Sequence, residues 1–224
     1  MLLLGHRGAF RYAAENTLTA FDLALAHGCD GFEFDVRRTA DGQAVICHDE
    51  RYRDRKIASS SYESLSPTGE LLCLQHVLAR YANRSFLYIE LKDNGLEGVV
   101  LDALRDCPPE RGYVVASFLP NVLEQLHALN SKVPLGLIAR YSRQLERWRQ
   151  SPVQYVMPKY SLVSPQTLEL LHSAGKTVFV WTVNSQRQMR ALSAAGADGM
   201  LSDDTDLLCR TFGRHAGQGG RISS

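Results

Sequence analysis

Short apolar runs alternate with longer amphipathic runs along almost the whole sequence, and this alternation limits the possible folds more than any other feature. Eight apolar runs have the length and composition of buried strands, and a helix-like run follows each one. The predicted strands cover Leu2–Gly5, Gly31–Val36, Phe86–Lys92, Tyr113–Ser117, Leu135–Ala139, Val153–Met157, Thr177–Val183 and Asp198–Ser202. Eight strand–helix units predict an α/β protein with the (β/α)8 TIM-barrel architecture.

An open, doubly wound sheet is the alternative architecture for such an alternation. Proteins of that kind often carry a glycine-rich phosphate loop of the form GxGxxG or GxxxxGK[ST]. Neither motif follows the first predicted strand, where the sequence reads LLLGHRGAF. The closed barrel is therefore the preferred prediction.

The length and composition of the chain are typical of one domain with a single hydrophobic core. The sequence has 224 residues, 45% of them hydrophobic, and we expect a single barrel domain over residues 1–212. The Gly-, Ser- and Arg-rich tail over residues 213–224 is expected to be disordered. The polar stretch Arg51–Gly69 is expected to be a loop, and Asn16 is expected to cap a helix that Gly28 ends.

Charge and cysteine usage exclude several classes of protein. Lys and Arg number 25 against 24 Asp and Glu, a net charge of +1 that does not indicate a nucleic-acid partner. The five cysteines are scattered without a CxxC pair, which favours reduced thiols over disulfides or structural zinc. No apolar run approaches the ~20 residues that span a bilayer, and the N-terminal run is too short for a signal peptide. We expect a cytoplasmic protein without stable membrane insertion; the sequence carries no signal for an oligomeric state.

Acidic residues lie on the inward face of two neighbouring predicted strands. Glu33 and Asp35 share one face of their strand, and Glu90 and Lys92 share one face of the next. The apolar residues between them suit the helix layer, so the acids are predicted to point into the barrel. Functional groups in this fold lie at the carboxyl ends of the strands. His6, at the end of the first strand, is expected beside them.

Three inward carboxylates would repel one another without compensation. A divalent cation is the natural remedy, and ligation by oxygen alone favours Mg²⁺ or Ca²⁺. Ion pairing with neighbouring arginines and lysines is the alternative interpretation of each acid taken singly. Taken together, Glu33, Asp35 and Glu90 favour a site for one divalent metal ion.

Further residues near the strand ends have the chemistry of phosphate ester hydrolysis. His48, followed by Asp49, has the features of a proton-transfer group oriented by a carboxylate. Arg7 and Lys92 provide positive charge for a phosphate. Trp181 either packs in the barrel or forms an apolar wall for a substrate, including a quaternary ammonium group through a cation–π contact.

The sequence resembles the glycerophosphodiester phosphodiesterase family. The resemblance rests mainly on the run HRG…ENTLTAF…FEFDV…HD and spans about residues 2 to 206. It continues in Tyr88–Lys92, Ser117-Phe118, Trp181–Asn184 and Gly196–Asp203. The resemblance implies a TIM-barrel enzyme in which His6 and His48 are the acid–base pair and Glu33, Asp35 and Glu90 hold the metal. It also implies that Arg7 and Lys92 contact the phosphate.

Two departures from the family pattern concern loops around the site. Ala14 stands where the family usually has proline before its Glu-Asn-Thr triplet. Arg51–Gly69 is short where members usually carry a small inserted subdomain, which we expect to be reduced here to a short loop. The segment that would select the alcohol therefore differs from the family.

The resemblance implies hydrolysis of small-molecule glycerophosphodiesters, such as glycerophosphocholine or glycerophosphoethanolamine, to glycerol 3-phosphate and an alcohol, and the predicted metal site makes this hydrolysis metal-dependent. His6 is assigned as acid and His48 as base, with either water or the glycerol 2-hydroxyl as the nucleophile. One alternative is a lysophospholipase D-like activity, for which Leu71-Leu72 and Leu119-Pro120 would offer an apolar access surface. The other is a non-catalytic barrel that binds a phosphodiester.

Overall fold

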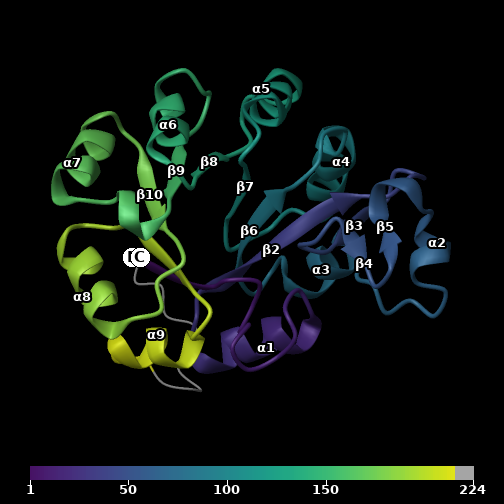
Figure 1. Ribbon diagram of the computed structural model, residues 1–224, viewed down its shortest axis with the longest axis horizontal. Coiled ribbons are helices and arrows are strands. Elements are labelled where there is room, and N and C mark those ends of the chain that lie inside the picture. The colour runs from purple at the N-terminus through teal and green to yellow at the C-terminus, as the bar shows by residue number, and fades with distance from the viewer. Residues whose placement is uncertain (215–224) are drawn as a thin grey trace.

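Eight parallel strands close into a barrel in the computed structural model, which describes residues 1–214 (Figure 1). The strands pair in the order β1, β2, β6, β7, β8, β9, β10, β11 and back to β1. Their bounds are β1 Leu2–Gly5, β2 Gly31–Arg38, β6 Phe86–Leu91, β7 Tyr113–Ser117, β8 Leu135–Ala139, β9 Tyr155–Pro158, β10 Thr177–Val180 and β11 Gly199–Ser202. The predicted (β/α)8 barrel is confirmed.

The barrel closes through β1, which lies between the second and the last parallel strand. Leu2 pairs with Gly199 of β11 along one edge, and Leu4 pairs with Gly31 of β2 along the other. Gly31 lies so close to β6 that a Cβ atom there would be 1.9 Å from the carbonyl oxygen of Phe86. Only glycine fits at this point, and the close approach lets β2 and β6 run side by side.

Helices cover the outside of the barrel, as Figure 1 shows. Their bounds are α1 Leu18–His27, α3 Leu74–Tyr81, α4 Glu97–Asp106, α5 Pro120–Leu129, α6 Ser142–Leu145, α7 Pro165–Ser173, α8 Gln186–Ala194 and α9 Thr205–Thr211. Short 3-10 turns follow α6 at Glu146–Arg149 and β9 at Tyr160–Leu162. Several of the α-helices begin at a residue whose side-chain hydroxyl or carboxylate caps the helix, because that oxygen accepts a hydrogen bond from an unpaired N–H of the first turn. Examples are Ser164, Ser185 and Asp204.

The start of α1 differs from the prediction. Thr17 is the cap, and its hydroxyl accepts a hydrogen bond from the backbone N–H of Ala20. Asn16 instead has a positive φ of 58° and turns its side chain into the barrel. The prediction that Asn16 caps the helix is therefore wrong, whereas Gly28 ends the helix in a left-handed conformation as expected.

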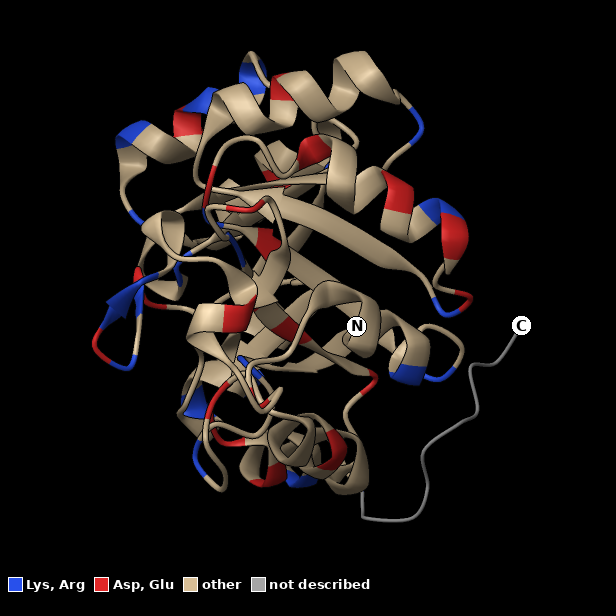
Figure 2. Cartoon of the chain, turned by 90° about the vertical axis from the view of Figure 1, so that its right-hand side faces the viewer, with Lys and Arg blue, Asp and Glu red and all other residues tan. Residues whose placement is uncertain are grey.

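Apolar residues pack on both sides of the barrel strands. Phe32, Phe34 and Val36 of β2 pack outward in the core shared with the helices, so the predicted strand faces are confirmed. A second cluster fills the barrel and includes Leu4 and Tyr88. In Figure 2 the lysines, arginines and acids lie largely on the outer helices and loops, while the strands are mostly uncharged.

A small insertion extends the barrel between β3 (Ala44–Ile46) and α3, and we call residues 47–73 the insertion. Its first elements are a hairpin of β4 (Arg51–Tyr52) and β5 (Arg55–Lys56). A 3-10 turn at Ile57–Ser59 and the helix α2 (Tyr62–Leu65) follow. The predicted loop over Arg51–Gly69 is therefore wrong in detail. A local core of Val45, Ile57, Leu65, Leu71 and Cys73 orders the segment.

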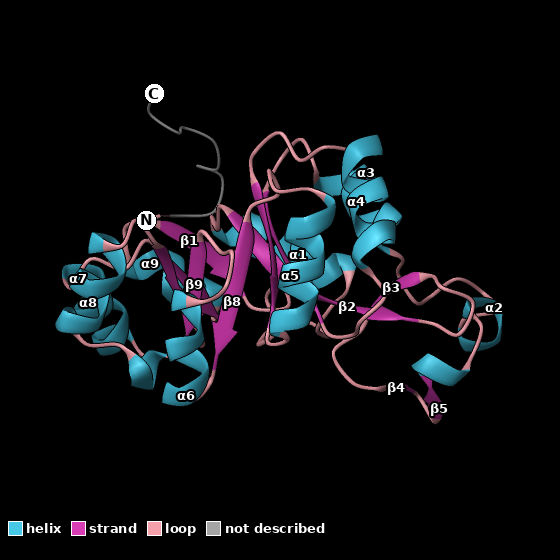
Figure 3. Cartoon of the chain, turned by 90° about the horizontal axis from the view of Figure 1, so that it is seen from above, coloured by secondary structure: helices cyan, strands magenta, loops and turns pink. Residues whose placement is uncertain are grey.

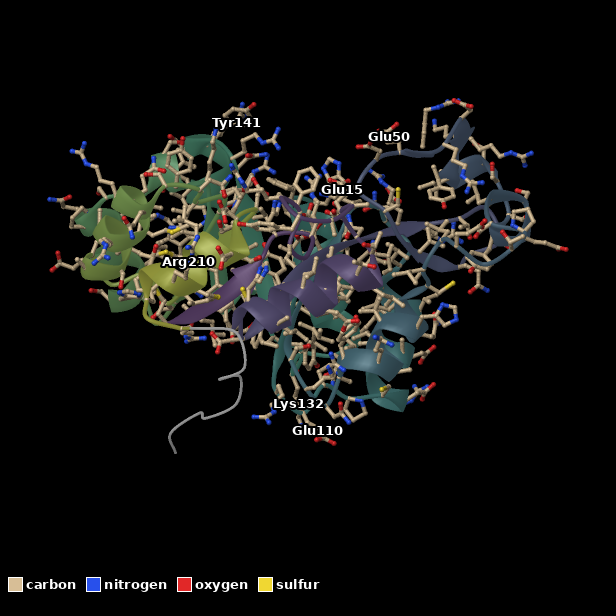
Figure 4. The ribbon with its side chains drawn as sticks, turned by 90° about the horizontal axis from the view of Figure 1, so that it is seen from below. Glu15, Glu50, Glu110, Lys132, Tyr141 and Arg210 are labelled. Carbon is tan, nitrogen blue, oxygen red and sulfur yellow. The ribbon has the colours of Figure 1, made fainter. Side chains whose placement is uncertain are left out.

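The loops at the two ends of the barrel form opposite faces. Figure 3 shows the insertion beside the barrel, and in Figure 4 the labelled Glu15, Glu50 and Tyr141 lie along one edge. Glu110 and Lys132, which precede strands β7 and β8, lie along the opposite edge. None of the helices within residues 1–214 has the length and apolar character needed to cross a membrane. The tail predicted over residues 213–224 falls largely outside the described residues.

Candidate active site

A pocket opens among residues at the carboxyl ends of the barrel strands. Its walls contain seven of the eight residues that the sequence singled out, and Asp35 lies directly behind them. The lining residues are His6, Arg7, Glu33, His48, Tyr88, Glu90, Lys92, Phe118, Ile138, Arg140, Trp181 and Leu201. The predicted site residues therefore come together in space.

Three buried carboxylates form the floor of the pocket. Glu33 and Asp35 project from β2, and Glu90 projects from β6, where it pairs in register with Asp35. One oxygen of each carboxylate lies within 4.8 Å of the others. Burial, together with the charge of the neighbouring acids, raises the pKa of Glu33 well above its ordinary value. Burial likewise raises the pKa of Glu90.

Two cations compensate part of this negative charge. Nζ of Lys92 lies 2.8 Å from Oδ1 of Asp35 and also contacts Glu90. Nε of Arg7 lies 3.3 Å from Oδ2 of Asp35. Burial alone would raise the pKa of Asp35, but Lys92 and Arg7 outweigh it and hold the pKa below its ordinary value. The backbone of Arg7 has a positive φ of 53°, and its N–H donates to Oε2 of Glu33 at 2.8 Å.

Glu15 adds a fourth carboxylate, because its Oε2 accepts a hydrogen bond of 2.7 Å from Nη1 of Arg7. Among residues 1–214, Arg7 and Lys92 make the ion pairs of these carboxylates, so the four acids outnumber their cationic partners by two. Oε1 of Glu33 is also buried without a hydrogen-bond partner among the described residues. A buried, unpaired carboxylate oxygen is costly. Both observations fit a divalent cation bound by oxygen ligands.

Asn16 fixes the position of Asp35 from the side. Its amide Nδ2 donates to Oδ2 of Asp35 at 2.8 Å, and its Oδ1 accepts from the backbone N–H of Asp35 at 3.1 Å. These contacts of Asn16 and Glu15 are not among the sequence-based predictions. Both belong to the Glu-Asn-Thr triplet, so the family resemblance contained the signal.

Each of the two histidines in the pocket is oriented by a carboxylate. Nδ1 of His6 lies 2.7 Å from Oδ1 of Asp203, and Nδ1 of His48 lies 2.8 Å from Oδ1 of Asp49. Because a carboxylate only accepts, each Nδ1 carries the hydrogen, and Nε2 is left for a ligand. Burial lowers the pKa of His48. The sequence analysis did not assign Asp203, although it directly follows the last strand.

Two aromatic side chains, Phe118 and Trp181, line the pocket, and we call them its aromatic wall. The Trp181 and Phe118 rings meet edge to face, with centroids 5.7 Å apart. Nε1 of Trp181 donates to the carbonyl oxygen of Met157 at 2.7 Å, which satisfies its polar atom within the barrel. Trp181 therefore both packs in the barrel and lines the pocket. Arg140, which the sequence analysis also missed, follows β8 directly, and that position was its signal.

Two further polar residues near strand ends, Ser117 and Lys159, lie outside the pocket wall. Ser117 is buried, and its hydroxyl donates to the carbonyl oxygen of Leu91 at 2.7 Å, which ties β7 to β6. Lys159 pairs with Trp181 through the backbone. Neither side chain lines the pocket.

Comparison with known proteins agrees with the geometry. A sequence model of the Glycerophosphoryl diester phosphodiesterase family matches residues 6–66 and 93–207. YhdW of Bacillus subtilis is 31% identical over 242 residues, covering 96% of this chain and 99% of that protein. A glycerophosphodiester phosphodiesterase of Caldanaerobacter subterraneus is 27% identical over 92% of this chain and 96% of its own length.

The fold has counterparts among solved structures. An Oleispira antarctica phosphodiesterase, determined with its product sn-glycerol-3-phosphate, superposes with a TM-score of 0.84 at 23% identity. The superposition covers 95% of this chain and 96% of that one. Because the family match covers most of the barrel and a relative exceeds 30% identity over nearly its whole length, the chain belongs to the glycerophosphodiester phosphodiesterase family, a family of hydrolases.

Proposed function

We propose that this chain hydrolyses glycerophosphodiesters to glycerol 3-phosphate and an alcohol, with one divalent cation, Mg²⁺ or Ca²⁺. One observation carries the proposal. His6 and His48, each held by a carboxylate, line the same pocket as a cluster of three buried carboxylates. Phosphodiester hydrolysis uses proton-transfer groups and oxygen ligands for a metal ion, and this pocket has both.

Glu33, Asp35 and Glu90 would hold the cation. When bound, it supplies Lewis-acid polarisation of a phosphoryl oxygen. The support for this assignment is the unpaired Oε1 of Glu33 and the excess negative charge around it. Oxygen ligands alone favour Mg²⁺ or Ca²⁺ over zinc.

Arg7 and Lys92 are assigned to the phosphate. Both line the pocket, and both are held in place by carboxylates rather than by solvent. Burial alone would lower the pKa of Lys92, but Glu90 and Asp35 outweigh it and keep the ammonium charged. Fixed cations stabilise the charge that develops on the phosphoryl oxygens in the transition state.

His6 and His48 are assigned to proton transfer. His48 is the base, because burial favours its neutral ring and leaves the Nε2 lone pair for the proton of the nucleophile. His6 is the acid that protonates the leaving alkoxide. Asp203 and Asp49 hold the two rings in the tautomer that these roles require.

The competing functions have less support in the site. The apolar access surface expected at Leu71-Leu72 is not formed, because Leu71 is buried in the core of the insertion. A lysophospholipase D-like activity therefore loses one of its two expected features. A barrel that only binds a phosphodiester does not need two histidines that are oriented by carboxylates. The glycerophosphodiester phosphodiesterase of Caldanaerobacter subterraneus and the Oleispira antarctica phosphodiesterase also favour an enzyme.

The test measures glycerol 3-phosphate released from a panel of glycerophosphodiesters with Mg²⁺, with Ca²⁺ and with EDTA. We expect release that EDTA abolishes and that falls at least ~10²-fold in His6→Ala and His48→Ala. His127→Ala, on the exposed side of α5, is the matched control. Phosphorus NMR of the product distinguishes water from the glycerol 2-hydroxyl, since only the second gives a cyclic phosphate. Full turnover in both histidine variants would refute the acid–base assignment.

A further inference from the structure

Arg140 projects from the end of β8 onto the aromatic wall of the pocket. Its guanidinium carbon lies 6.0 Å from the ring centre of Phe118 and 5.8 Å from that of Trp181. The two rings belong to different strand ends, after β7 and after β10. The arginine therefore places a positive charge on the wall itself, within the residues that line the pocket.

This charge differs from the other cations of the pocket. Arg7 is paired with Glu15 and Asp35, and Lys92 is paired with acids on the floor. Among residues 1–214, no carboxylate forms an ion pair with Arg140, whose backbone N–H donates to Gln144. A guanidinium carries five N–H donors and no acceptor, so its donors can bind an anion that enters the pocket.

The position of Arg140 separates it from the phosphate that is cleaved. Lys92 lies 6.0 Å from the centre of the Phe118 ring and forms ion pairs with Asp35 and Glu90 of the carboxylate floor. Arg140 lies the same distance from that ring, but it also lies 5.8 Å from the ring centre of Trp181, which follows β10. In the barrel β10 is four strands from β6, the strand that carries Glu90. An anion on Arg140 is therefore a neighbour of the scissile phosphate rather than the scissile phosphate itself.

We propose that Arg140 recognises an anionic group on the alcohol moiety of the substrate. The inference rests on the proposed function and narrows its substrate class. The enzyme then prefers glycerophosphodiesters whose alcohol carries a phosphate, which a guanidinium binds through two parallel hydrogen bonds. A quaternary ammonium is disfavoured, because Arg140 repels it and already occupies the Trp181 and Phe118 rings that would attract it.

Three substrates test this selectivity. They are glycerophosphoglycerol, its analogue with a phosphate on the distal hydroxyl, and glycerophosphocholine. In the wild-type protein we expect kcat/KM to be highest for the phosphorylated compound and lowest for the choline compound. In Arg140→Gln the ratio of kcat/KM for the phosphorylated and neutral substrates should fall about fivefold, the scale of a partly exposed charge pair. The preference should also weaken at high salt.

Two further variants test whether the change in substrate preference comes from the charge of Arg140 in the pocket. Arg140→Lys keeps the charge and should retain part of the preference. Arg143→Gln removes the same charge from an exposed position of α6 outside the pocket and should leave the ratio as in the wild type. An unchanged ratio in Arg140→Gln, or an equal change in Arg143→Gln, would overturn the inference.

A different result would show that the proposed hydrolase function itself is wrong. If the wild-type protein releases glycerol 3-phosphate from none of the three compounds with any divalent metal, the hydrolase proposal fails. Calorimetric titration of the phosphorylated compound into wild type and Arg140→Gln then decides the inference by itself. A Kd about fivefold weaker in the variant supports anion recognition by Arg140, and equal Kd values refute it.

Discussion

His6 and Asp203 lie 197 positions apart in the sequence, yet Nδ1 of the histidine and Oδ1 of the aspartate are 2.7 Å apart. The contact joins the loop after the first barrel strand to the loop after the last. The second oxygen of Asp203 accepts from Nδ2 of Asn184 at 2.6 Å. Asp203 thus receives a donor on each oxygen, and only a carboxylate satisfies both.

Asp203→Asn should disable the histidine without removing it. An asparagine must turn its NH₂ group towards either His6 or Asn184, both of which donate, so one contact becomes unfavourable. We expect kcat to fall on the order of 10²-fold with a smaller change in KM. Steady-state kinetics measure this split. Asp206→Asn, which removes the half-buried partner of Arg210 on α9, is the control, and an equal loss in both variants would contradict the prediction.

Divalent metal should stabilise the fold through the carboxylate floor. At 100 times Kd, the bound ion adds about 2.7 kcal/mol, which corresponds to a rise in Tm of about 5–10 °C for a chain of this size. In Glu33→Gln this rise should disappear, while the metal-free Tm should equal or exceed that of the wild type because a buried carboxylate is gone. Thermal unfolding with EDTA and with Mg²⁺ or Ca²⁺ measures both.

Glu97 offers a matched control for that experiment. It is also buried, and its Oε1 lacks a hydrogen-bond partner among the described residues, but it lies on α4 outside the cluster. Glu97→Gln should keep the full metal-induced rise in Tm. A rise that survives in Glu33→Gln would place the cation elsewhere.

Asn16 should matter to the metal site although it is no proposed ligand. Removing its two hydrogen bonds frees the Asp35 carboxylate to rotate, and we expect metal affinity to fall about 10- to 100-fold. Asn16→Ala should also be less stable than Asn16→Gly by about 0.5–1 kcal/mol, because φ is 58° at this position. Calorimetric metal binding and urea unfolding of both variants test these expectations.

Asp22 should make stability depend on acid pH. It joins α1 to α3 through contacts with Arg80 at 2.6 Å and Arg84 at 3.0 Å. Burial alone would raise the pKa of Asp22, but Arg80, Tyr81 and Arg84 hold the pKa below its ordinary value of 3.8. A depressed pKa contributes stability above the unfolded-state pKa and loses it as the pH falls through the folded-state pKa.

Asp22→Asn should therefore destabilise the protein at pH 6 by less than about 1 kcal/mol, since the pair is partly exposed. At about pH 3 the difference from the wild type should shrink as the wild-type carboxylate protonates. Urea unfolding at the two pH values measures it. Asp102→Asn, from the exposed pair with Arg105, is the control, and a difference that persists unchanged in acid would refute the argument.

Local pattern was enough to predict the barrel and the direction of its acids. In β2 the alternation of Phe32 and Phe34 with Glu33 and Asp35 has only one sensible arrangement, because the apolar set must meet the helices. The structure places them that way. Strand register and barrel closure then bring Glu90 beside Asp35.

The positions of some residues depend on tertiary contacts that the local sequence pattern does not contain. Asn16 has the chemistry of a helix cap, but Thr17 takes that position and Asn16 bonds to Asp35 instead. The pair Leu71-Leu72 was predicted to offer an apolar access surface, yet the core of the insertion buries Leu71. Arg140 directly follows β8 but belongs to no local motif, so its place in the pocket depends on how the strand ends meet.

The insertion leaves and rejoins the barrel at almost the same point. Val45 and Cys73 pair as an antiparallel bridge, and the N–H of Ile46 donates to the carbonyl oxygen of Leu72 at 2.8 Å. Loop-closure entropy grows slowly with length, by about 0.6 kcal/mol per doubling. This stem is therefore a graft point, where segments of different length and chemistry can be exchanged by evolution or design while all eight parallel strand pairings persist.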